Sequence, residues 1–369
     1  MRIGILSMQR ILNYGSFFQA YSLKQIIESL GHEVVFVDFK VNWNISLIER
    51  YKNKRFRHLK MIKRMLLHPH DYKLIQKDPL YEYFQPCYTM LGMSSKYHFR
   101  TKVDVLVVGS DEVFNCLQQS DRVGYSLELF GKNNRARRLI SYAASFGNTT
   151  IKRLEKYKVD KTVAHYLCRF DALSVRDCNS LEIIQHLCGK TPEQHLDPTL
   201  ISDLEKQNWK GCKFEHFIIV YGYSHRFSVD EGNAIMYFAK REHLKVVVLN
   251  AKQVFGDEFV LCRPDEILGY FSKANYVVTD TFHGTIFSVL YHKPIAVFCR
   301  LDCQCDYSNE NKLLDLLDRL GLKNQLVTDS HDLYQVLKNR IDYEWIDQIR
   351  AVEYEKAISY LRKEIATCP

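Results

Sequence analysis

The residues best suited to chemistry lie together at 275–285, where an apolar strand passes through a polar turn into a helix. The helix is predicted to begin near Phe282, which places His283 at the carboxyl end of the strand. An imidazole can act as a general acid or base near neutral pH, so His283 is the predicted catalytic residue. In the structural alternative, Asp280 and Thr281 merely cap the helix and the imidazole packs in the core. Function is favoured because many suitable groups converge on one strand end.

The helix start in this run is also predicted to bind an anion. The first amides of a helix have no partner within the helix, and the helix dipole adds partial positive charge, so a phosphate fits there. Gly284 would let a ligand come close to the backbone because it has no Cβ. The predicted donor-binding groups are therefore the amides of Gly284, Thr285 and Ile286, together with Thr281.

Two other strand ends carry polar side chains. One apolar strand ends at Ser110 and Asp111, which could bind sugar hydroxyls or cap the next helix. Another ends at Arg176, whose burial is costly unless the guanidinium meets an anion. That anion is either a carboxylate of the chain, such as Asp177, or a bound phosphate or carboxylate. The first case is a structural ion pair and the second is a binding site, and the sequence leaves both open.

Further candidates follow other predicted strands, although such positions more often serve turns or packing. What sets them apart is their place, because ligands bind at the carboxyl ends of parallel strands. They are the Asn13-Tyr14-Gly15 turn, Asn115, the corner at 197–199, Tyr223 after the first strand of the second half, and Arg300 after a later strand.

Alternating strands and helices predict parallel sheets with crossover helices, and thus an α/β protein with two Rossmann-like domains facing a cleft. The first domain is predicted at 1–205 and the second at 206–340, followed by a C-terminal helix at 341–369 that packs back on the first domain. Ser16 is the expected N-cap of the first helix, and Gly31 its end. The expected strands lie at 2–7, 34–39, 103–109, 139–144 and 172–175, then at 217–221, 245–249, 276–279 and 294–298.

The composition fits a protein without disulfides, a metal or a membrane span. At 369 residues with 46% hydrophobic side chains, two domains have ample material for their cores. The 11 cysteines are mostly scattered, and the cluster Cys299, Cys303 and Cys305 lacks an evident fourth ligand, so we expect reduced thiols and no metal. No apolar run is long enough to span a membrane and no leader precedes the first strand, so we expect a cytoplasmic location.

The charge and the missing motifs narrow the function classes. A net charge of +8 suits an anionic partner, but no nucleic-acid motif is present. The segment 47–75 is rich in Lys and Arg, with apolar residues at helical spacing. It is either a solvated helix face or an interfacial helix that docks peripherally on anionic lipid at the inner face of the cell membrane. No Walker-type loop, Gly-rich dinucleotide fingerprint or nucleophile elbow is present, which argues against a kinase, dehydrogenase or α/β-hydrolase.

Several of these stretches, in this order and spacing, resemble the polysaccharide pyruvyl transferase family over about residues 2–320. The matching stretches are Ile3 to Leu6, Asn13 to Ala20, Gly109 to Asn115, Ser141 to Gly147, Ser174 to Asp177, Leu196 to Thr199 and Asp280 to Thr285. The resemblance implies a fold like that of two-domain glycosyltransferases. It also implies phosphoenolpyruvate as donor and a sugar hydroxyl pair of a bacterial surface polysaccharide, or of its lipid-linked precursor, as acceptor. The products would be a pyruvate ketal and phosphate.

The resemblance also implies roles for single residues. The family's catalytic His matches His283, and the Arg that holds the phosphate or carboxylate of the donor matches Arg176. We expect Asp111 or Asp280 to orient the imidazole or an acceptor hydroxyl, and we expect no cofactor, because the enol phosphate is already activated. The residues expected to bind the acceptor are Asn13, Tyr14, Gly15, Ser110, Asn115 and Tyr223.

One position departs from the family pattern. Some members carry an Arg two positions before the catalytic His, and here that place is Thr281. Arg300 and Arg263 are the candidates for the missing charge. Two rival interpretations follow: a glycosyltransferase of the same fold that uses a nucleotide sugar, and a non-catalytic polysaccharide-assembly protein.

Overall fold

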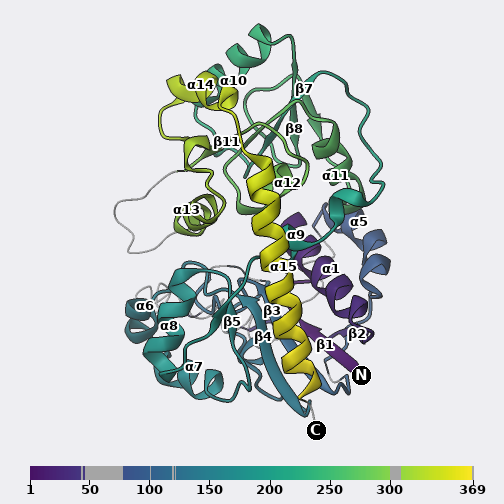
Figure 1. The fold of residues 1–369 in the computed structure, drawn as a ribbon, viewed down its shortest axis with the longest axis vertical. Helices are drawn as coiled ribbons and strands as arrows, with labels where there is room; N and C mark the ends of the chain where they lie inside the picture. The colour runs from purple at the N-terminus through teal and green to yellow at the C-terminus, as the bar shows by residue number, and fades with distance from the viewer. Residues whose placement is uncertain are drawn as a thin grey trace, which may run out of the picture. The chain divides into compact units, whose positions relative to one another are not determined.

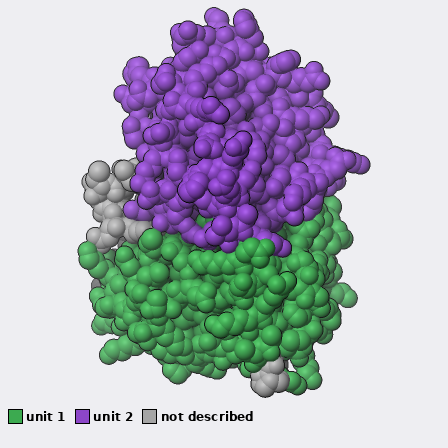
Figure 2. Space-filling model, viewed as in Figure 1, with its two compact units in different colours: residues 1–198, 355–369 green, residues 199–354 purple. Residues whose placement is uncertain are grey.

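The protein divides into two compact units, which Figure 2 colours separately. Unit 1 comprises residues 1–198 and 355–369, and unit 2 comprises residues 199–354. The computed structural model describes residues 1–42, 45, 78–99, 101–118, 120, 122–299 and 309–367. The predicted basic helix at 47–75 lies outside the described residues, and so do Arg300, Cys303 and Cys305.

Unit 1 is built on a parallel sheet with the strand order β2-β1-β3-β4-β5-β6. All seven residues of β3 are buried, as is usual for a parallel strand that helices cover on both faces. This explains the continuous apolar run at 105–108, where β3 begins. The strands are β1 (Arg2–Leu6), β2 (Glu33–Phe36), β3 (Val105–Asp111), β4 (Arg138–Ala144), β5 (Ser174–Val175) and β6 (Glu193–Gln194).

The helices of unit 1 connect these strands, and the first of them begins differently from the prediction. Helix α1 (Tyr14–Ser29) is capped by Asn13, whose side-chain oxygen accepts a 3.1 Å hydrogen bond from the amide of Ser16. Ser16 was predicted as the cap, but it lies inside the first turn, so that prediction is wrong. Gly31 follows the end of the helix with a φ of +85°, a conformation that favours glycine. The other segments are α5 (Tyr81–Phe84), α6 (Ile151–Lys156), α7 (Asp160–Leu167) and α8 (Cys178–Cys188), and the 3₁₀ helices η1 (Gln85–Leu91) and η2 (Leu127–Phe130).

Unit 2 repeats the same architecture with a second parallel sheet, ordered β12-β11-β10-β7-β8-β9. Its strands are β7 (Phe217–Tyr221), β8 (Lys245–Leu249), β9 (Glu258–Val260), β10 (Tyr276–Thr279), β11 (Ile295–Phe298) and β12 (Leu326–Val327). Its helices are α9 (Pro198–Ile201), α10 (Val229–Arg241), α11 (Pro264–Lys273), α12 (Phe282–Leu290), α13 (Asn309–Arg319) and α14 (Leu333–Lys338), with short 3₁₀ turns η3 (Leu204–Lys206), η4 (Lys323–Gln325) and η5 (Ser330–Asp332). The predicted class of two Rossmann-like α/β domains is therefore confirmed.

The strand order reverses once in each unit, and the reversal marks where a ligand is expected. In unit 1 the chain passes from β1 to β2 on one side and then places β3 on the other side of β1. In unit 2 the strands β8 and β9 extend on one side of β7, and β10 lies on the other. Ligands of open parallel sheets bind outside the carboxyl ends of the strands at such a switch point. A ligand is therefore expected beside the residues that follow β1 and β3 in unit 1, and beside those that follow β7 and β10 in unit 2.

Helix α15 (Tyr343–Ala366) ends the chain and returns it to unit 1, as predicted (Figure 1). Its apolar residues Ala357, Ile358, Leu361 and Ile365 are buried at helical spacing. The Tyr360 hydroxyl donates a 2.8 Å hydrogen bond to the carbonyl of Ser141 on β4, and Glu364 pairs with Arg138. Among the helices of the described residues, none is long and apolar enough to cross a membrane.

Candidate functional site

His283 lies at the switch point of unit 2, in the first turn of α12. Strand β10 ends at Thr279, and α12 begins at Phe282. The residue His283 is partly exposed, although Nε2 of its ring is buried, and its ring centre lies 5.3 Å from that of Phe282 and 6.2 Å from that of Phe287. The helix that the sequence predicted near Phe282 is therefore present, and the imidazole is neither in the core nor fully in solvent. This is a position from which it can meet a ligand.

Thr281 caps α12, and this cap engages the amides that were predicted to bind an anion. The Thr281 hydroxyl oxygen accepts a 3.0 Å hydrogen bond from the amide of Gly284. The Thr281 carbonyl accepts both the amide of Thr285, at 3.2 Å, and the hydroxyl of Thr285, at 3.1 Å. The amides of Gly284 and Thr285 are thus not the open donors that the sequence suggested, which corrects that prediction. The structural alternative, in which these residues cap the helix, is correct for Thr281, which is the N-cap. Asp280 does not cap the helix, and its carboxylate contacts Arg226.

Loss of this cap should weaken unit 2 measurably. We expect Thr281→Ala to lower the free energy of unfolding by about 1 kcal/mol, because the Gly284 amide loses its acceptor. Thr281→Ser keeps the hydroxyl and serves as the matched control. Urea unfolding of both variants checks this, and equal stability of the alanine and serine variants would contradict the assignment.

Gly284 has a packing role and not the ligand-approach role that was predicted. A Cβ on this residue would lie 2.6 Å from the Thr281 hydroxyl and 2.7 Å from the Tyr221 ring, and it would also meet the Thr279 hydroxyl. The space in front of its backbone is therefore filled by residues of β7 and β10 and by the cap. Close approach of the helix to the sheet, and not of a ligand to the helix, explains the glycine.

Adding a methyl group at this glycine should destabilise the protein. Gly→Ala in an unconstrained helix stabilises by roughly 0.5–1 kcal/mol, but overpacking costs about 1–3 kcal/mol. We expect Gly284→Ala to lower the free energy of unfolding, because the crowding atoms include an aromatic ring and two short side chains with little freedom to move. Thermal unfolding of the variant tests the sign, and a raised melting temperature would refute the packing explanation.

Asp280 is fully buried and pairs with a residue that the sequence analysis missed, Arg226. One carboxylate oxygen of Asp280 lies 3.1 Å from Nε of Arg226, and the Asp280 side chain is 0% exposed. The other oxygen lies against Gly222, where an added Cβ would approach it to 2.6 Å. Residues Thr279 and Tyr221 are paired in the sheet, so Asp280 and Gly222 are the next residues along neighbouring strands. The predicted role of Asp280 in orienting His283 stays a prediction, and the contact seen for its carboxylate is with Arg226.

Arg226 brings a positive charge to the edge of the sheet where Thr281 replaces the expected arginine. Its guanidinium lies 5.3 Å from the ring centre of Tyr223, which is itself 50% exposed. Of the two arginines proposed from sequence, Arg263 pairs with Asp265 at 2.9 Å and Arg300 lies outside the described residues, so their role stays a prediction. Sequence alone gave no strand order, so the loop after β7 did not stand out as a neighbour of the loop after β10.

In unit 1, Arg176 is held between two carboxylates. Its Nη1 lies 2.7 Å from Asp197 and its Nη2 lies 3.4 Å from Asp111, with side-chain exposures of 4%, 0% and 11% respectively. Burial alone would lower the pKa of the guanidinium, but the two carboxylates raise it above its ordinary value, so the charge is retained. Of the partners that the sequence left open, Asp177 or another carboxylate, the second is observed, and Asp177 instead caps α8 by accepting the amide of Ser180 at 2.9 Å. The ion-pair alternative is thus present, and donor binding by Arg176 stays a prediction.

Asp111 ties the two strand ends of this switch point together. It adopts a φ of +77°, and its carboxylate accepts a 2.6 Å hydrogen bond from the Ser16 hydroxyl at the start of α1. The same carboxylate contacts Arg176 through its other oxygen. Because Asp197 is also present, this cluster carries more negative than positive charge. Such a set of carboxylates accepts hydrogen bonds from hydroxyl groups more readily than it holds a phosphate.

Most residues predicted to bind the acceptor are instead committed to internal contacts. Ser110 is fully buried and donates to the carbonyl of Ala143 at 3.2 Å. Asn115 is buried and donates to Glu112 at 2.6 Å, while Tyr14 packs its ring 5.0 Å from that of Phe84. These side chains, with the buried Gly15, hold the strand ends in place and do not face solvent. Asn13 is partly exposed but serves as the cap of α1, so Tyr223 is the predicted residue that offers an exposed surface.

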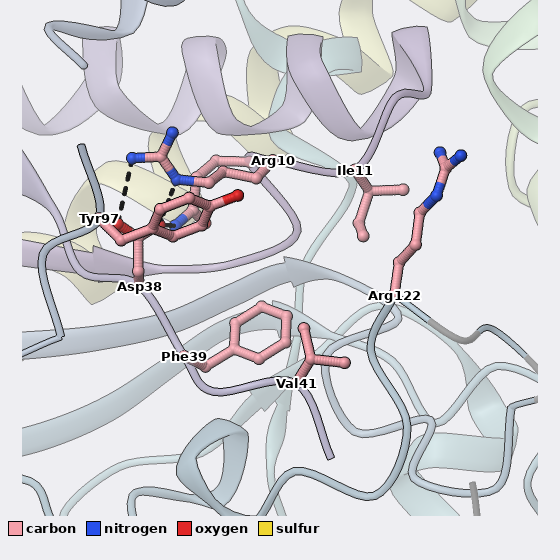
Figure 3. A pocket seen from close by; sticks show the side chains of 8 residues that line it. Arg10, Ile11, Asp38, Phe39, Val41, Tyr97 and Arg122 are labelled. Atoms are coloured by element: carbon pink, nitrogen blue, oxygen red, sulfur yellow. Dashed lines mark hydrogen bonds and ion pairs between the residues drawn. The ribbon is translucent and has the colours of Figure 1, made fainter. Parts of the chain in front are cut away.

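A hollow beside the ends of β1 and β2 was not foreseen from sequence (Figure 3). The Arg10 guanidinium makes two contacts with Asp38, at 2.7 and 3.1 Å, and lies 4.2 Å from the ring centre of Tyr97. Burial raises the pKa of Tyr97 to about 12, although Arg10 opposes the shift. The hollow has a volume of about 290 Å³, including space open to solvent, and Ile11 and Phe39 are among the apolar residues of its walls. Because the charged groups are paired with each other, the cluster fixes the loop that leads from β1 into α1.

A metal site is not found within the part of the chain that the structure describes. There, no three His, Cys, Asp or Glu side chains gather in a way that could hold an ion. Cys299 is partly exposed, and the other two cysteines of the predicted cluster lie outside the described ranges.

The architecture of two parallel α/β units is shared with solved structures over nearly the whole length of both chains. The structure of S. aureus MnaA in complex with UDP is similar over 99% of this chain and 96% of its own, with 11% identity and a TM-score of 0.52. A putative UDP-N-acetylglucosamine 2-epimerase from Listeria monocytogenes is similar over 100% of this chain and 98% of its own, with 9% identity and a TM-score of 0.50. At these identities the likeness establishes the fold. The comparison with curated protein sequences gave no match.

The sequence model of the polysaccharide pyruvyl transferase family matches residues 13–298, which contain the switch-point residues of both units. The chain therefore belongs to the polysaccharide pyruvyl transferase family. This membership makes it a transferase of polysaccharide biosynthesis and implies a saccharide acceptor. The resemblance noted in the sequence is confirmed, and the motif that contains His283 falls inside the matched range.

Proposed function

We propose that this transferase moves a pyruvyl group from phosphoenolpyruvate to two hydroxyls of one sugar in a surface polysaccharide or its lipid-linked precursor. The observation that carries the proposal is the place of His283. It combines partial exposure with a position at the β7–β10 switch point, next to the turn that holds the Asp280–Arg226 pair. An imidazole and a guanidinium at one strand edge suit a small anionic donor that must also exchange a proton.

The chemistry needs one proton delivered to carbon and one proton removed from each of the two hydroxyls. The first sugar hydroxyl adds across the enol double bond: its oxygen bonds to the central carbon and loses its proton, while the methylene carbon gains a proton and becomes a methyl group. The second hydroxyl then attacks the same carbon, the carbon–phosphate oxygen bond breaks, and phosphate leaves while the second hydroxyl loses its proton. We assign His283 the proton transfer, for which a positioned acid or base typically contributes about 10²–10⁴-fold. The enol phosphate is already activated, so the proposed reaction requires no cofactor.

We propose that the donor binds to unit 2 and the acceptor to unit 1. The support for the donor is the positive charge of Arg226 near the first turn of α12. The support for the acceptor is the carboxylate cluster at the β1–β3 switch point, where the partly accessible Asp111 is a suitable acceptor of sugar hydroxyl hydrogen bonds. In this proposal Arg176 keeps the cluster in place through Asp111 and Asp197, whether or not it also reaches the donor.

A phosphate-release assay tests the function directly. The purified protein is incubated with phosphoenolpyruvate and a panel of galactose-, glucose- and mannose-type acceptors, and inorganic phosphate and the ketal are measured together. We expect acceptor-dependent phosphate release with equal amounts of ketal. Release of a nucleotide from a nucleotide sugar would support a glycosyltransferase instead, and sugar binding without release from any donor would support an assembly protein.

A cytoplasmic enzyme that reaches a lipid-linked acceptor would benefit from peripheral contact with the membrane, and we propose this role for the basic segment 47–75. Its charge predicts binding that depends on anionic lipid and is weakened by salt. Co-sedimentation with vesicles of increasing phosphatidylglycerol content tests the proposal, and binding that ignores lipid charge would overturn it.

A further inference from the structure

The loop between β7 and α10 presents a guanidinium in a fixed position at the switch point of unit 2. Arg226 lies on the exposed ring of Tyr223, 5.3 Å from the ring centre, and its Nε lies 3.1 Å from the buried carboxylate of Asp280. Its side chain is 31% exposed, whereas that of Asp280 is 0% exposed. The arginine is therefore held by the Asp280 carboxylate and by the Tyr223 ring, while part of its side chain is exposed to solvent.

The rest of the loop is also held, so the position of Arg226 does not depend on the ion pair alone. The amide of His225 donates to the carbonyl of Lys252 at 2.8 Å, and the side chain of Gln253 donates to the carbonyl of Tyr223 at 2.8 Å. Phe227 is buried, and Ser228 starts α10 with a capping box. The loop is thus tied to the end of β8 on one side and to α10 on the other. A guanidinium positioned in this way loses little conformational entropy when it binds a ligand.

The guanidinium of Arg226 and the start of α12 lie at the same strand edge of unit 2. A guanidinium has several N–H donors in a planar fork that matches carboxylate and phosphate groups, and the Arg226 side chain is 31% exposed. The first turn of α12 starts two residues after Asp280, so its positive dipole end lies at the same strand edge. The carboxylates of unit 1 give the opposite environment, because there Arg176 is outnumbered by Asp111 and Asp197.

We propose that Arg226, braced by Tyr223 and Asp280, is the residue that binds the phosphate or carboxylate group of the small anionic donor. The inference rests on the proposed function for the identity of the donor as phosphoenolpyruvate, but the anion site itself is a property of unit 2. In this role Arg226 binds the donor and does not transfer a proton. Asp280 is a positioning residue that acts through Arg226.

Equilibrium binding and kinetics of three variants test the assignment. Arg226→Gln removes the charge and Arg226→Lys keeps it without the planar fork. Arg241→Gln is the matched control, because Arg241 also lies over a tyrosine ring, that of Tyr334 at 4.5 Å, at the other end of α10. Helix α10 has 13 residues and is about 20 Å long, so the control removes the same charge from the opposite end of the helix.

The probe is phosphoenolpyruvate, measured by calorimetry and by the phosphate-release assay. We expect Arg226→Gln to weaken binding and raise KM about 10–100-fold, with a smaller change in kcat, since charge-assisted hydrogen bonds are lost. Arg226→Lys should lie between the wild type and the glutamine variant, and Arg241→Gln should match the wild type. A wild-type protein that turns over phosphoenolpyruvate while Arg226→Gln keeps the same KM and dissociation constant would overturn the inference and leave the function intact.

A failure of the phosphate-release assay separates the proposed function from the proposed anion site. If no acceptor supports phosphate release, the proposed function fails, and binding of phosphoenolpyruvate or inorganic phosphate to the wild type is then compared with binding to Arg226→Gln. Binding that depends on Arg226 supports the anion site by itself. Binding that is equal in both proteins, or absent from the wild type, overturns it.

Discussion

Replacing His283 by alanine is expected to lower kcat for phosphate release from phosphoenolpyruvate by about 10²–10⁴-fold, with the dissociation constant of the donor changed only a few-fold. The reason is that a proton must reach the methylene carbon of the enol, and His283 is the titratable side chain in the first turn of α12 at the switch point. The donor's charge would be held by Arg226 and not by the imidazole. Single-turnover measurements on the purified variant, with donor binding measured separately, distinguish the two effects.

The control for this experiment lies just beyond the other end of the same helix. His292 stacks on Tyr343, with ring centres 4.6 Å apart, and lies 3.0 Å from Asp347, outside the switch point. His292→Ala should keep kcat near the wild-type value, so a general effect of removing an imidazole near α12 would be visible. His283→Gln retains a polar side chain of similar size but cannot exchange a proton, and it should be as slow as the alanine variant. A His283→Ala protein with near-normal kcat would remove the basis of the proposed mechanism.

The sheets of this protein could be predicted because their signal is local. The residues of β3 and β7 are buried throughout, and each strand contains an uninterrupted apolar run, at 105–108 and 217–221. The start of α12 could be predicted for the same reason, since a strand, a polar turn and a cap follow one another directly. The cap of α1 was misassigned because Asn13 and Ser16 both suit that position, and local sequence does not decide between them.

The chemistry of the strand ends could not be predicted in the same way, because it depends on which strands are neighbours. Arg226 becomes a candidate only when β7 and β10 are known to be adjacent, which brings the loop after each strand to one edge. Gly284 seemed open to a ligand until the residues in front of it, from β7 and β10, were known. The partners of Arg176 come from 21 and 65 residues away along the chain, whereas the neighbouring Asp177 was the obvious choice. Nonlocal packing thus decided each of these roles.

Replacing Asp197 by asparagine is expected to lower the free energy of unfolding by about 3–5 kcal/mol. The Asp197 side chain is 0% exposed and makes the shorter of the two contacts of Arg176, 2.7 Å against 3.4 Å for Asp111. The two carboxylates keep Arg176 charged in the folded protein, so the variant would leave the buried guanidinium without its shorter carboxylate contact. Removing one partner of a buried pair is costly for this reason, even where the intact pair adds little to stability.

Urea unfolding followed by circular dichroism measures this loss of stability. The loss is compared with the effect of breaking an exposed ion pair of the same unit. Arg2 and Glu33 lie 3.1 Å apart with exposures of 46% and 64%, so Arg2→Met should change stability by less than about 1 kcal/mol. Asparagine matches the size of aspartate, so packing is preserved and the charge alone is removed. An Asp197→Asn protein as stable as the wild type would mean that Arg176 does not depend on this carboxylate in the folded chain. That result would favour a role for Arg176 in binding an anionic ligand over a role in a structural ion pair. The reason is that a buried guanidinium needs an anion nearby, and a ligand could then be that anion.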